Sequence, residues 1–268
     1  MPLFFMQPTY QRSLFYLVSA FLGGLILLFV IAPLVGLFVH AGVGNTYQAM
    51  QEKEVTDSFL LTLITAFLAT FVSSLGAIPL AYLLARRKFP LKGIVTGIID
   101  LPLVIPHSAA GIAILGFITR DSAIGKAASA FGLSFVGSPA AICIAMAFVS
   151  LPILINAARD GFLAVPVRLE QAAMNLGASP FRVFLSIALP LAWRSVVSGY
   201  IMMFARGMSE FGAVVIVAYH PMIAPVLIFE RFSSYGLKYA TPVAALFILV
   251  SLVVFILFRL VVKKEKDA

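Results

Sequence analysis

Long uncharged apolar segments constrain the fold of this chain more than any other feature of its sequence. The first of them, Leu14–Val39, contains no acidic or basic residue and exceeds the ~18 apolar residues that mark a membrane-spanning helix. Of the 268 residues, 62% are hydrophobic and only 11% are charged. Soluble domains have about 45–50% apolar and about 25% charged residues. The chain is therefore expected to be an integral membrane protein.

Six such segments are predicted to cross the membrane as helices, within a single transmembrane domain covering residues 1–268. Their approximate bounds are 14–39, 58–85, 93–119, 139–158, 196–219 and 240–262. The first segment is longer than the ~7–15-residue core of a signal peptide and is expected to be retained as a span. The expected fold is all-α, and an even number of spans puts both termini on one side of the membrane.

The Lys and Arg residues between the spans predict the orientation, because cytoplasmic loops carry an excess of them. Placing the N-terminus inside assigns thirteen to the cytoplasm, namely Arg12, Arg86, Arg87, Lys88, Lys92, Arg159, Arg168, Arg182, Arg194, Arg259, Lys263, Lys264 and Lys266. The five that then lie outside are Lys53, Arg120, Lys126, Arg231 and Lys238, while Arg206 lies within a span. Both termini and the segment 159–190 are therefore expected to be cytoplasmic.

Two prolines interrupt the third predicted span, in the run Leu-Pro-Leu-Val-Ile-Pro-His that begins at Leu101. Pro102 and Pro106 each remove a backbone donor and clash with the preceding helical turn. Backbone groups freed at membrane depth are tolerated only where they face protein or a water-filled cavity. The span is therefore a candidate pore wall, in which His107 and Ser108 could donate to an oxyanion. A kinked helix packed on its neighbours, with His107 as a packing residue, explains the same pattern.

The fifth predicted span carries two opposite charges, Arg206 and Glu210. An isolated ionised side chain near the middle of a membrane costs about 2.5–3.5 kcal/mol. Their spacing of four residues lets the two side chains neutralise each other on one helical face. One interpretation is a pore wall in which Arg206 or Ser209 meets a passing anion. The other is a structural ion pair that holds the span inside the bundle.

The segment between the fourth and fifth spans, 159–190, predicts two short helices that meet at a bend. Pro166 suits the first turn of a helix, and Gly177 can take the left-handed conformation that ends one. Ser179 then offers an N-cap oxygen to the next helix, which begins at Pro180.

The first of these helices, Val167–Leu176, is short and of mixed polarity. Its adjacent alanines, Ala172 and Ala173, leave a low surface that the groove of another protein can approach closely. One interpretation is a docking segment for a cytoplasmic partner. The other is a solvated amphipathic connector, since such connectors are common between membrane spans.

Several function classes are disfavoured by what the sequence lacks. No Gly-x-x-x-x-Gly-Lys-Ser/Thr loop is present, so the chain is not expected to bind ATP itself. The protease and lipase motifs His-Glu-x-x-His and Gly-x-Ser-x-Gly are also missing, so an enzyme is not expected. The single cysteine, Cys143, excludes a cysteine-built metal site. The net charge of +8 is spread along the chain, which argues against nucleic acid binding, and no cofactor is expected.

The segment 159–190 resembles the EAA signature of bacterial and archaeal ABC importer permeases. The matching residues are Gln171, Ala172, Ala173, Gly177, Ile187, Leu189 and Pro190. Gln171 stands where the family usually has Glu, and Glu170 precedes it. The runs that contain Arg206 and Pro106 are similar to the molybdate, tungstate and sulfate branch. The run that begins at Tyr219 is similar to archaeal molybdate/tungstate permeases.

The resemblance implies a permease homodimer that works with two cytoplasmic ATPase subunits and an external oxyanion-binding protein. It also implies that the segment 159–190 is the coupling segment, which sits in a groove of the ATPase and flips the pore between inward-open and outward-open states. The docking residues are then Glu170, Gln171, Ala172, Ala173, Gly177, Ser179 and Pro190. The alternatives are the same machine with sulfate or thiosulfate as its cargo, and a secondary transporter or channel that needs no ATPase.

Overall fold

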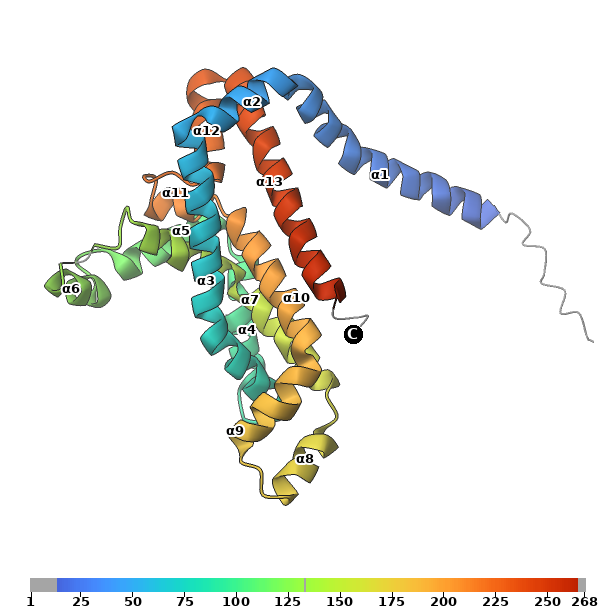
Figure 1. Cartoon of the computed structure of the whole chain (residues 1–268). Coiled ribbons are helices and arrows are strands. Elements are labelled where there is room, and N and C mark those ends of the chain that lie inside the picture. The colour runs from blue at the N-terminus through green and yellow to red at the C-terminus, as the bar shows by residue number, and fades with distance from the viewer. Residues whose placement is uncertain (1–13, 133, 265–268) are drawn as a thin grey trace, which may run out of the picture.

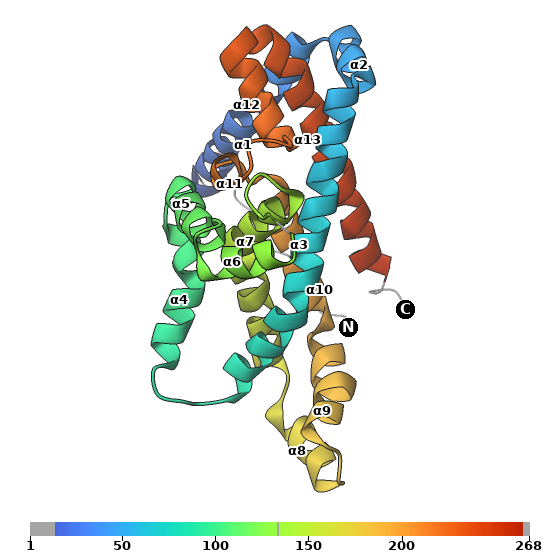
Figure 2. The ribbon, with the colours of Figure 1, turned by 90° about the vertical axis from the view of Figure 1, so that its left-hand side faces the viewer.

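The computed structural model describes residues 14–132 and 134–264, and every regular element within them is helical. In chain order these are α1 (Leu14–Ala41), α2 (Val43–Gln51), α3 (Lys53–Arg86), α4 (Lys92–Val104), α5 (His107–Ile118), α6 (Ala123–Ala130), α7 (Pro139–Ala164), α8 (Val167–Asn175), α9 (Pro180–Val183), the π-helical turn η1 (Phe184–Ala188), α10 (Leu189–Met208), α11 (Val214–Val217), α12 (Ala224–Tyr235) and α13 (Leu237–Lys264). Helices α2 and α12 lie at one end of the molecule and α8 at the other (Figures 1 and 2).

Within the described part of the chain, five helical stretches are long and apolar enough to span a membrane: α1, α3, α7, the continuous α9–η1–α10 and α13. The third predicted span differs from a kinked helix, because α4 and α5 meet at an angle of 112°. Pro106 explains the break, since the residue before a proline is pushed out of the helical region. Ile105 indeed has an extended backbone (φ −71°, ψ 147°). The described residues therefore hold five long spans, and a sixth if the bent α4–α5 pair counts as one.

The prediction for the fifth span, 196–219, is wrong in its bounds. The helix runs from Pro180 to Met208, and the chain then leaves it for an irregular stretch before α11. Glu210 lies in this stretch, where its carboxylate accepts a hydrogen bond from the backbone N–H of Ala213 (2.8 Å), directly before α11 begins. At the other side, α7 continues to Ala164, so the fourth span is longer than the predicted 139–158.

Helices α3, α7 and α10 form the centre of the bundle, and small residues let them approach closely. A Cβ atom on Gly199 of α10 would lie 2.7 Å from the Cβ of Ala157, and one on Gly161 of α7 would lie 2.5 Å from the Cβ of Ser195. In lipid, where helices gain little from burying apolar surface, such close backbone contact is the main source of packing energy. A hydrogen bond from Asn156 of α7 to Asp100 (2.6 Å) adds α4 to this core.

Helix α1 diverges from this bundle along most of its length (Figure 1). None of its most apolar window is buried within the chain. A helix that is apolar all round requires lipid or another protein on every side.

We predict that Gly199→Ala destabilises the protein, because the added methyl group overlaps Ala157 between two backbones that cannot separate without losing their packing. Overpacking of this kind costs about 1–3 kcal/mol. Thermal unfolding in detergent should show a lower midpoint. Gly76→Ala in α3 is the matched control, since its new Cβ meets nothing within 4 Å and gains helix propensity. Equal midpoints for the two variants would contradict this account of the α7–α10 contact.

Candidate functional site

The predicted bend after α8 is confirmed. Gly177 has a left-handed backbone (φ 88°), the N–H of Gly177 donates to the carbonyl of Met174 (2.9 Å), and that of Ala178 donates to Ala173 (3.0 Å). This pair of bonds is the Schellman ending of a helix. The hydroxyl of Ser179 then accepts from the N–H of Arg182 (3.3 Å), which makes Ser179 the predicted cap of the next helix.

Helix α8 projects beyond the ends of the spanning helices and presents most of its surface outward (Figures 1 and 2). Gln171 and Ala172 are exposed, and Ala173 is half-buried. Large apolar side chains are exposed beside them, namely Val167, Leu169, Met174, Leu176 and Phe181, of which Leu176 is 90% exposed. Leu169 and Leu176 are seven positions apart and share one side of this segment, and exposed apolar side chains on a common side mark a protein contact more often than a solvated connector.

Glu170 differs from the rest of α8, because its side chain turns inward and is only 3% exposed. Its carboxylate accepts hydrogen bonds from Arg86 Nε (2.8 Å) and Nη2 (2.6 Å) and from the hydroxyl of Tyr82 (2.8 Å). Glu170 therefore anchors α8 to α3, and the other residues of α8 form its outward surface. The sequence analysis missed Tyr82 and Arg86, which lie more than 80 positions away on α3 and carry no local signal.

Pro190 lies in the first turn of α10, directly after the π-helical turn η1. Proline has no N–H to offer the carbonyl four residues earlier. The helix adjusts by widening, and the N–H of Leu189 donates instead to the carbonyl of Phe184, five residues back. The signature residues Ile187, Leu189 and Pro190 thus accompany a local change of helix geometry between α9 and α10.

The break between α4 and α5 and the break after α10 face each other, and three charged or polar side chains join them. This polar cluster consists of His107, Arg206 and Glu210. Arg206 Nη2 lies 2.9 Å from Glu210 Oε2 and 2.8 Å from His107 Nε2, and His107 Nδ1 lies 3.4 Å from the same carboxylate oxygen. The predicted Arg206–Glu210 ion pair is confirmed, although Glu210 lies beyond the end of the helix.

Burial differs sharply within the polar cluster. The side chain of Glu210 is 1% exposed, whereas those of Arg206 and His107 are 27% and 43% exposed. The carboxylate is thus enclosed, while the two groups that can donate to an anion remain partly accessible. Gly212 lets the backbone after α10 come close to His107, since a Cβ on Gly212 would lie 2.7 Å from that of His107.

The remaining pore candidates surround the polar cluster. Pro102 is buried within α4, Pro106 caps the start of α5, and Ser108 is exposed in its first turn. Ser209 is exposed, and its hydroxyl donates to the carbonyl of Arg206 (3.0 Å). No group of three or more His, Cys, Asp or Glu side chains suited to a metal ion occurs within residues 14–132 and 134–264.

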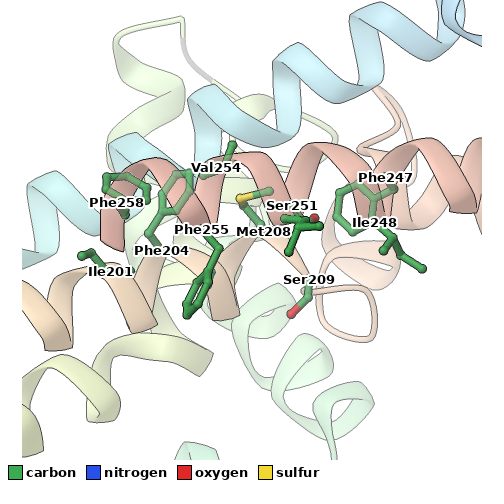
Figure 3. Close-up of a pocket in the computed structure, with 12 residues that line it drawn as sticks. Ile201, Phe204, Met208, Ser209, Phe247, Ile248, Ser251, Val254, Phe255 and Phe258 are labelled. Carbon is green, nitrogen blue, oxygen red and sulfur yellow. The ribbon is translucent and has the colours of Figure 1, made fainter. Parts of the chain in front are cut away.

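Ser209 also borders a groove between α10 and α13 with a volume of about 390 Å³ (Figure 3). Phe204, Met208, Phe247, Phe255 and Phe258 line it, and the hydroxyls of Ser209 and Ser251 are its main polar groups. An apolar surface of this kind suits a helix or a lipid chain and is unsuited to an oxyanion, which requires donors.

At the α12 end, Arg231 contacts Glu54 (3.2 Å) and also Glu52, and Tyr219 donates a hydrogen bond to Glu230. The hydrogen bond raises the pKa of Tyr219 above its ordinary value. The same bond, with a second from Ser234, lowers the pKa of Glu230. The Arg231 contacts tie α12 to the start of α3, and the Tyr219 bond ties it to its preceding loop.

The comparisons with known proteins place this geometry in context. The model of the family described as "Binding-protein-dependent transport system inner membrane component" matches residues 77–267. A molybdate/tungstate transport system permease protein of Thermococcus kodakarensis is 40% identical over 93% of this chain and 96% of its own length. A sulfate transport system permease protein of Synechocystis is 29% identical over 88% of this chain and 85% of its own.

Two solved structures are similar in fold at low sequence identity. A bacterial ABC transporter involved in alginate import has a TM-score of 0.73 at 16% identity, covering 93% of this chain and 96% of that one. The methionine ABC transporter MetNI in an inward-facing conformation has a TM-score of 0.65, also at 16% identity, covering 78% of this chain and 95% of that one.

We predict that Arg206→Ala lowers stability and yield more than it lowers transport per folded molecule, because it leaves the buried carboxylate of Glu210 without its main partner. Leaving a buried polar group unpaired costs about 1–3 kcal/mol. Unfolding midpoints and uptake by equal amounts of folded protein would be compared. The double variant Arg206→Ala/Glu210→Gln should recover part of the loss. Normal stability with a selective loss of uptake would assign Arg206 to the permeation path instead.

We also predict a pH dependence for the Tyr219–Glu230 contact. Because the pKa of Glu230 is lowered from 4.5 in the folded protein, the contact stabilises the fold above that pH and loses its effect as the pH falls through the lowered pKa. Tyr219→Phe should therefore lower the unfolding midpoint at pH 7 and lower it by less at pH 3. Tyr47→Phe, at an exposed position of α2, is the control. A deficit of equal size at both pH values would contradict the assignment.

Proposed function

The chain belongs to the family of binding-protein-dependent transport system inner membrane components, and on that premise we propose that it carries molybdate and tungstate across the cell membrane. It is a multi-pass membrane protein and the permease subunit of an ABC importer. Permease proteins for molybdate/tungstate transport that are about 40% identical over nearly the whole chain support this cargo. The observation that carries the mechanism is the projecting helix α8.

Helix α8 is proposed as the site at which a separate cytoplasmic ATPase docks. Its exposed apolar side chains, with the low surface at Ala172, form a ridge of the kind that enters a groove of a partner. The connection from α3 to α4 lies toward the same end of the molecule as α8 (Figure 2). It carries Arg86, Arg87, Lys88 and Lys92, which supports a cytoplasmic location for α8 and the termini. The chain itself supplies no phosphate-binding loop, so the driving reaction belongs to the partner.

The polar cluster and the bent α4–α5 pair are proposed as part of the gate that alternating access opens and closes. Two irregular backbone segments meet there, which lipid tolerates only in a protein-lined or wet environment. The partly exposed Arg206 and His107, with Ser108 and Ser209 beside them, can offer donors to a tetrahedral oxyanion. Glu210 weakens their net attraction, and weak binding suits a path that must release its cargo.

We further propose that two copies of the chain form the pore. The exposed α1 lacks a partner surface over most of its length, while a groove of about 740 Å³ between α3 and α7 offers one. The groove between α10 and α13 in Figure 3 is a second apolar surface available to the other copy. An external oxyanion-binding protein is proposed at the α12 end. The alginate transporter has been solved in complex with a periplasmic protein, which supports such a partner in general.

Sulfate is the second candidate cargo, because sulfate permease proteins are about 30% identical to this chain. Sulfate has the same charge and a similar shape, so the permease alone discriminates poorly between the anions. Calorimetry of molybdate, tungstate and sulfate binding to the cognate binding protein would separate the two proposals. Membership of this family sets aside the alternative of a channel or secondary transporter.

We predict that Gly177→Val impairs ATP-driven uptake by proteoliposomes, because a β-branched residue resists the left-handed backbone that ends α8. The penalty is about 1–2 kcal/mol, and it is conformational rather than steric, since a Cβ at this position meets nothing within 4 Å. Gly177→Asn is the control, because asparagine tolerates this conformation. Gly177→Asp should be milder than Gly177→Val for the same reason. Normal uptake and normal retention of the ATPase in Gly177→Val would contradict a docking role for α8.

A further inference from the structure

Glu170 stands out because a carboxylate is rarely buried on an otherwise exposed helix. It is the one buried residue of α8, and its two carboxylate oxygens are both occupied, one by Arg86 and the other by Tyr82. The side chain of Arg86 is 11% exposed and that of Glu170 is 3% exposed. Water is thus largely excluded from the pair.

The contact joins three elements at one point. Tyr82 and Arg86 are one turn apart at the end of α3, and Glu170 is in α8. Arg86 Nη2 also donates to the carbonyl of Val165 (3.0 Å), the residue that ends α7. Arg86 therefore holds the end of α7 and the start of α8 together with one guanidinium group.

Tyr82 extends the junction to a fourth element. Its ring lies 5.3 Å from that of Phe162 on α7 and 5.0 Å from that of Phe184 in the π-helical turn that leads into α10. Edge and tilted contacts at such distances are favourable aromatic packing. The hydroxyl that binds Glu170 thus belongs to a ring fixed by α3, α7 and the start of α10.

The connections of α8 to the chain explain why a third attachment matters. On one side, Val165 and Pro166 are extended, and on the other the chain turns at Gly177 before α9 begins. A short helix held only at its two ends can rotate about the line that joins them. A bond from the middle of the helix to a fixed neighbour removes that freedom.

We propose that Tyr82, Arg86 and Glu170 form a latch that makes α8 move as one body with the inner ends of α3 and α7. A displacement of α8 by the ATPase is then transmitted to the spanning helices instead of being absorbed by rotation at Pro166 and Gly177. The proposal rests on the ATPase-driven function above and assigns these three as positioning residues. A buried ion pair often contributes little net stability. The role assigned to this pair is therefore to fix the orientation of α8 relative to α3 and α7.

The chemistry of the latch requires arginine. Its fork supplies Nε and Nη2 to Glu170 and a further donor direction to Val165, whereas a lysine ammonium is a single point on a flexible stem. Charge-assisted hydrogen bonds are about twice as strong as neutral ones. Glu170→Gln preserves the shape of the side chain and removes this assistance, which makes it the sharpest variant.

The first test measures the latch without ATPase or cargo. Spin labels would be attached to Leu83→Cys on α3 and Asn175→Cys on α8 in a Cys143→Ala background, with the chain in lipid nanodiscs. We expect one narrow distance distribution for the parent, and a distribution at least about twofold wider when Glu170→Gln is added. Arg87→Gln, which removes an exposed charge next to the latch, should leave the distribution narrow. An unchanged distribution in Glu170→Gln would overturn the latch.

The second test measures coupling in the complete complex with its ATPase and binding protein. We expect the Glu170→Gln complex to keep its ATPase bound and to go on hydrolysing ATP. The amount of oxyanion moved per ATP should fall about tenfold, a factor that corresponds to the free energy of one charge-assisted hydrogen bond. Tyr82→Phe, which keeps the ring and removes the hydroxyl, should show a smaller loss, and Arg87→Gln none. Release of the ATPase by Glu170→Gln, or an unchanged ratio, would overturn the latch as a coupling device.

The two tests separate this inference from the function on which it rests. If the parent complex moved neither molybdate, tungstate nor sulfate, the proposed function would fail while the distance measurement still reported on the junction. If the parent complex worked and both the distances and the coupling ratio ignored Glu170→Gln, the latch alone would fail. A charge-reversed pair, Arg86→Glu with Glu170→Arg, should recover part of the coupling that either change alone removes.

Discussion

The hydrocarbon of the membrane offers no hydrogen bonds, and the structure depends on satisfying every polar group without it. Along α3, the hydroxyls of Thr62, Thr65 and Thr70 return to carbonyls one turn earlier in their own helix. Thr62 also accepts from the N–H of Ala224, which begins α12. Where the backbone leaves the helical pattern, near Pro106 and near Glu210, the two irregular segments lie against each other. Their freed groups thereby meet protein rather than lipid.

The same constraint explains why two buried carboxylates hold the short segments outside the long helices, namely α8 and the stretch after α10. Glu210 lies just after the end of α10, accepts from the N–H of Ala213 and pairs with Arg206, so the turn after the helix is held by charge as well as by backbone bonds. Glu170 does the same for α8 through Arg86. In both cases an arginine on a long helix holds a carboxylate on a neighbouring short segment. Burial strengthens such contacts and makes them sensitive to the loss of either partner.

These two anchors lie at different depths and serve different parts of the transport cycle proposed above. The Arg206–Glu210 pair joins the two segments of the candidate gate. The Arg86–Glu170 pair joins α8, the candidate ATPase contact, to the end of α3. Helices α7 and α10, packed through Gly161 and Gly199, connect the two levels. The similarity of fold to importers that share only 16% identity shows that this helical frame is compatible with different cargoes.

The membrane location, the helical class and the helix ends around Gly177 follow from the sequence, because each depends on the composition or conformation of neighbouring residues. The Arg206–Glu210 pair was also predictable, since the two lie four positions apart. Other features depend on residues distant in the chain and required the tertiary structure. The 112° bend at Pro106, the end of α10 at Met208, the approach of His107 to Arg206 and the inward turn of Glu170 toward Arg86 are of this kind. A proline predicts that a helix breaks but not the angle of the break, and the sequence does not identify the partner of a buried carboxylate. The angle and the partner are both fixed by packing between helices that are distant in the sequence.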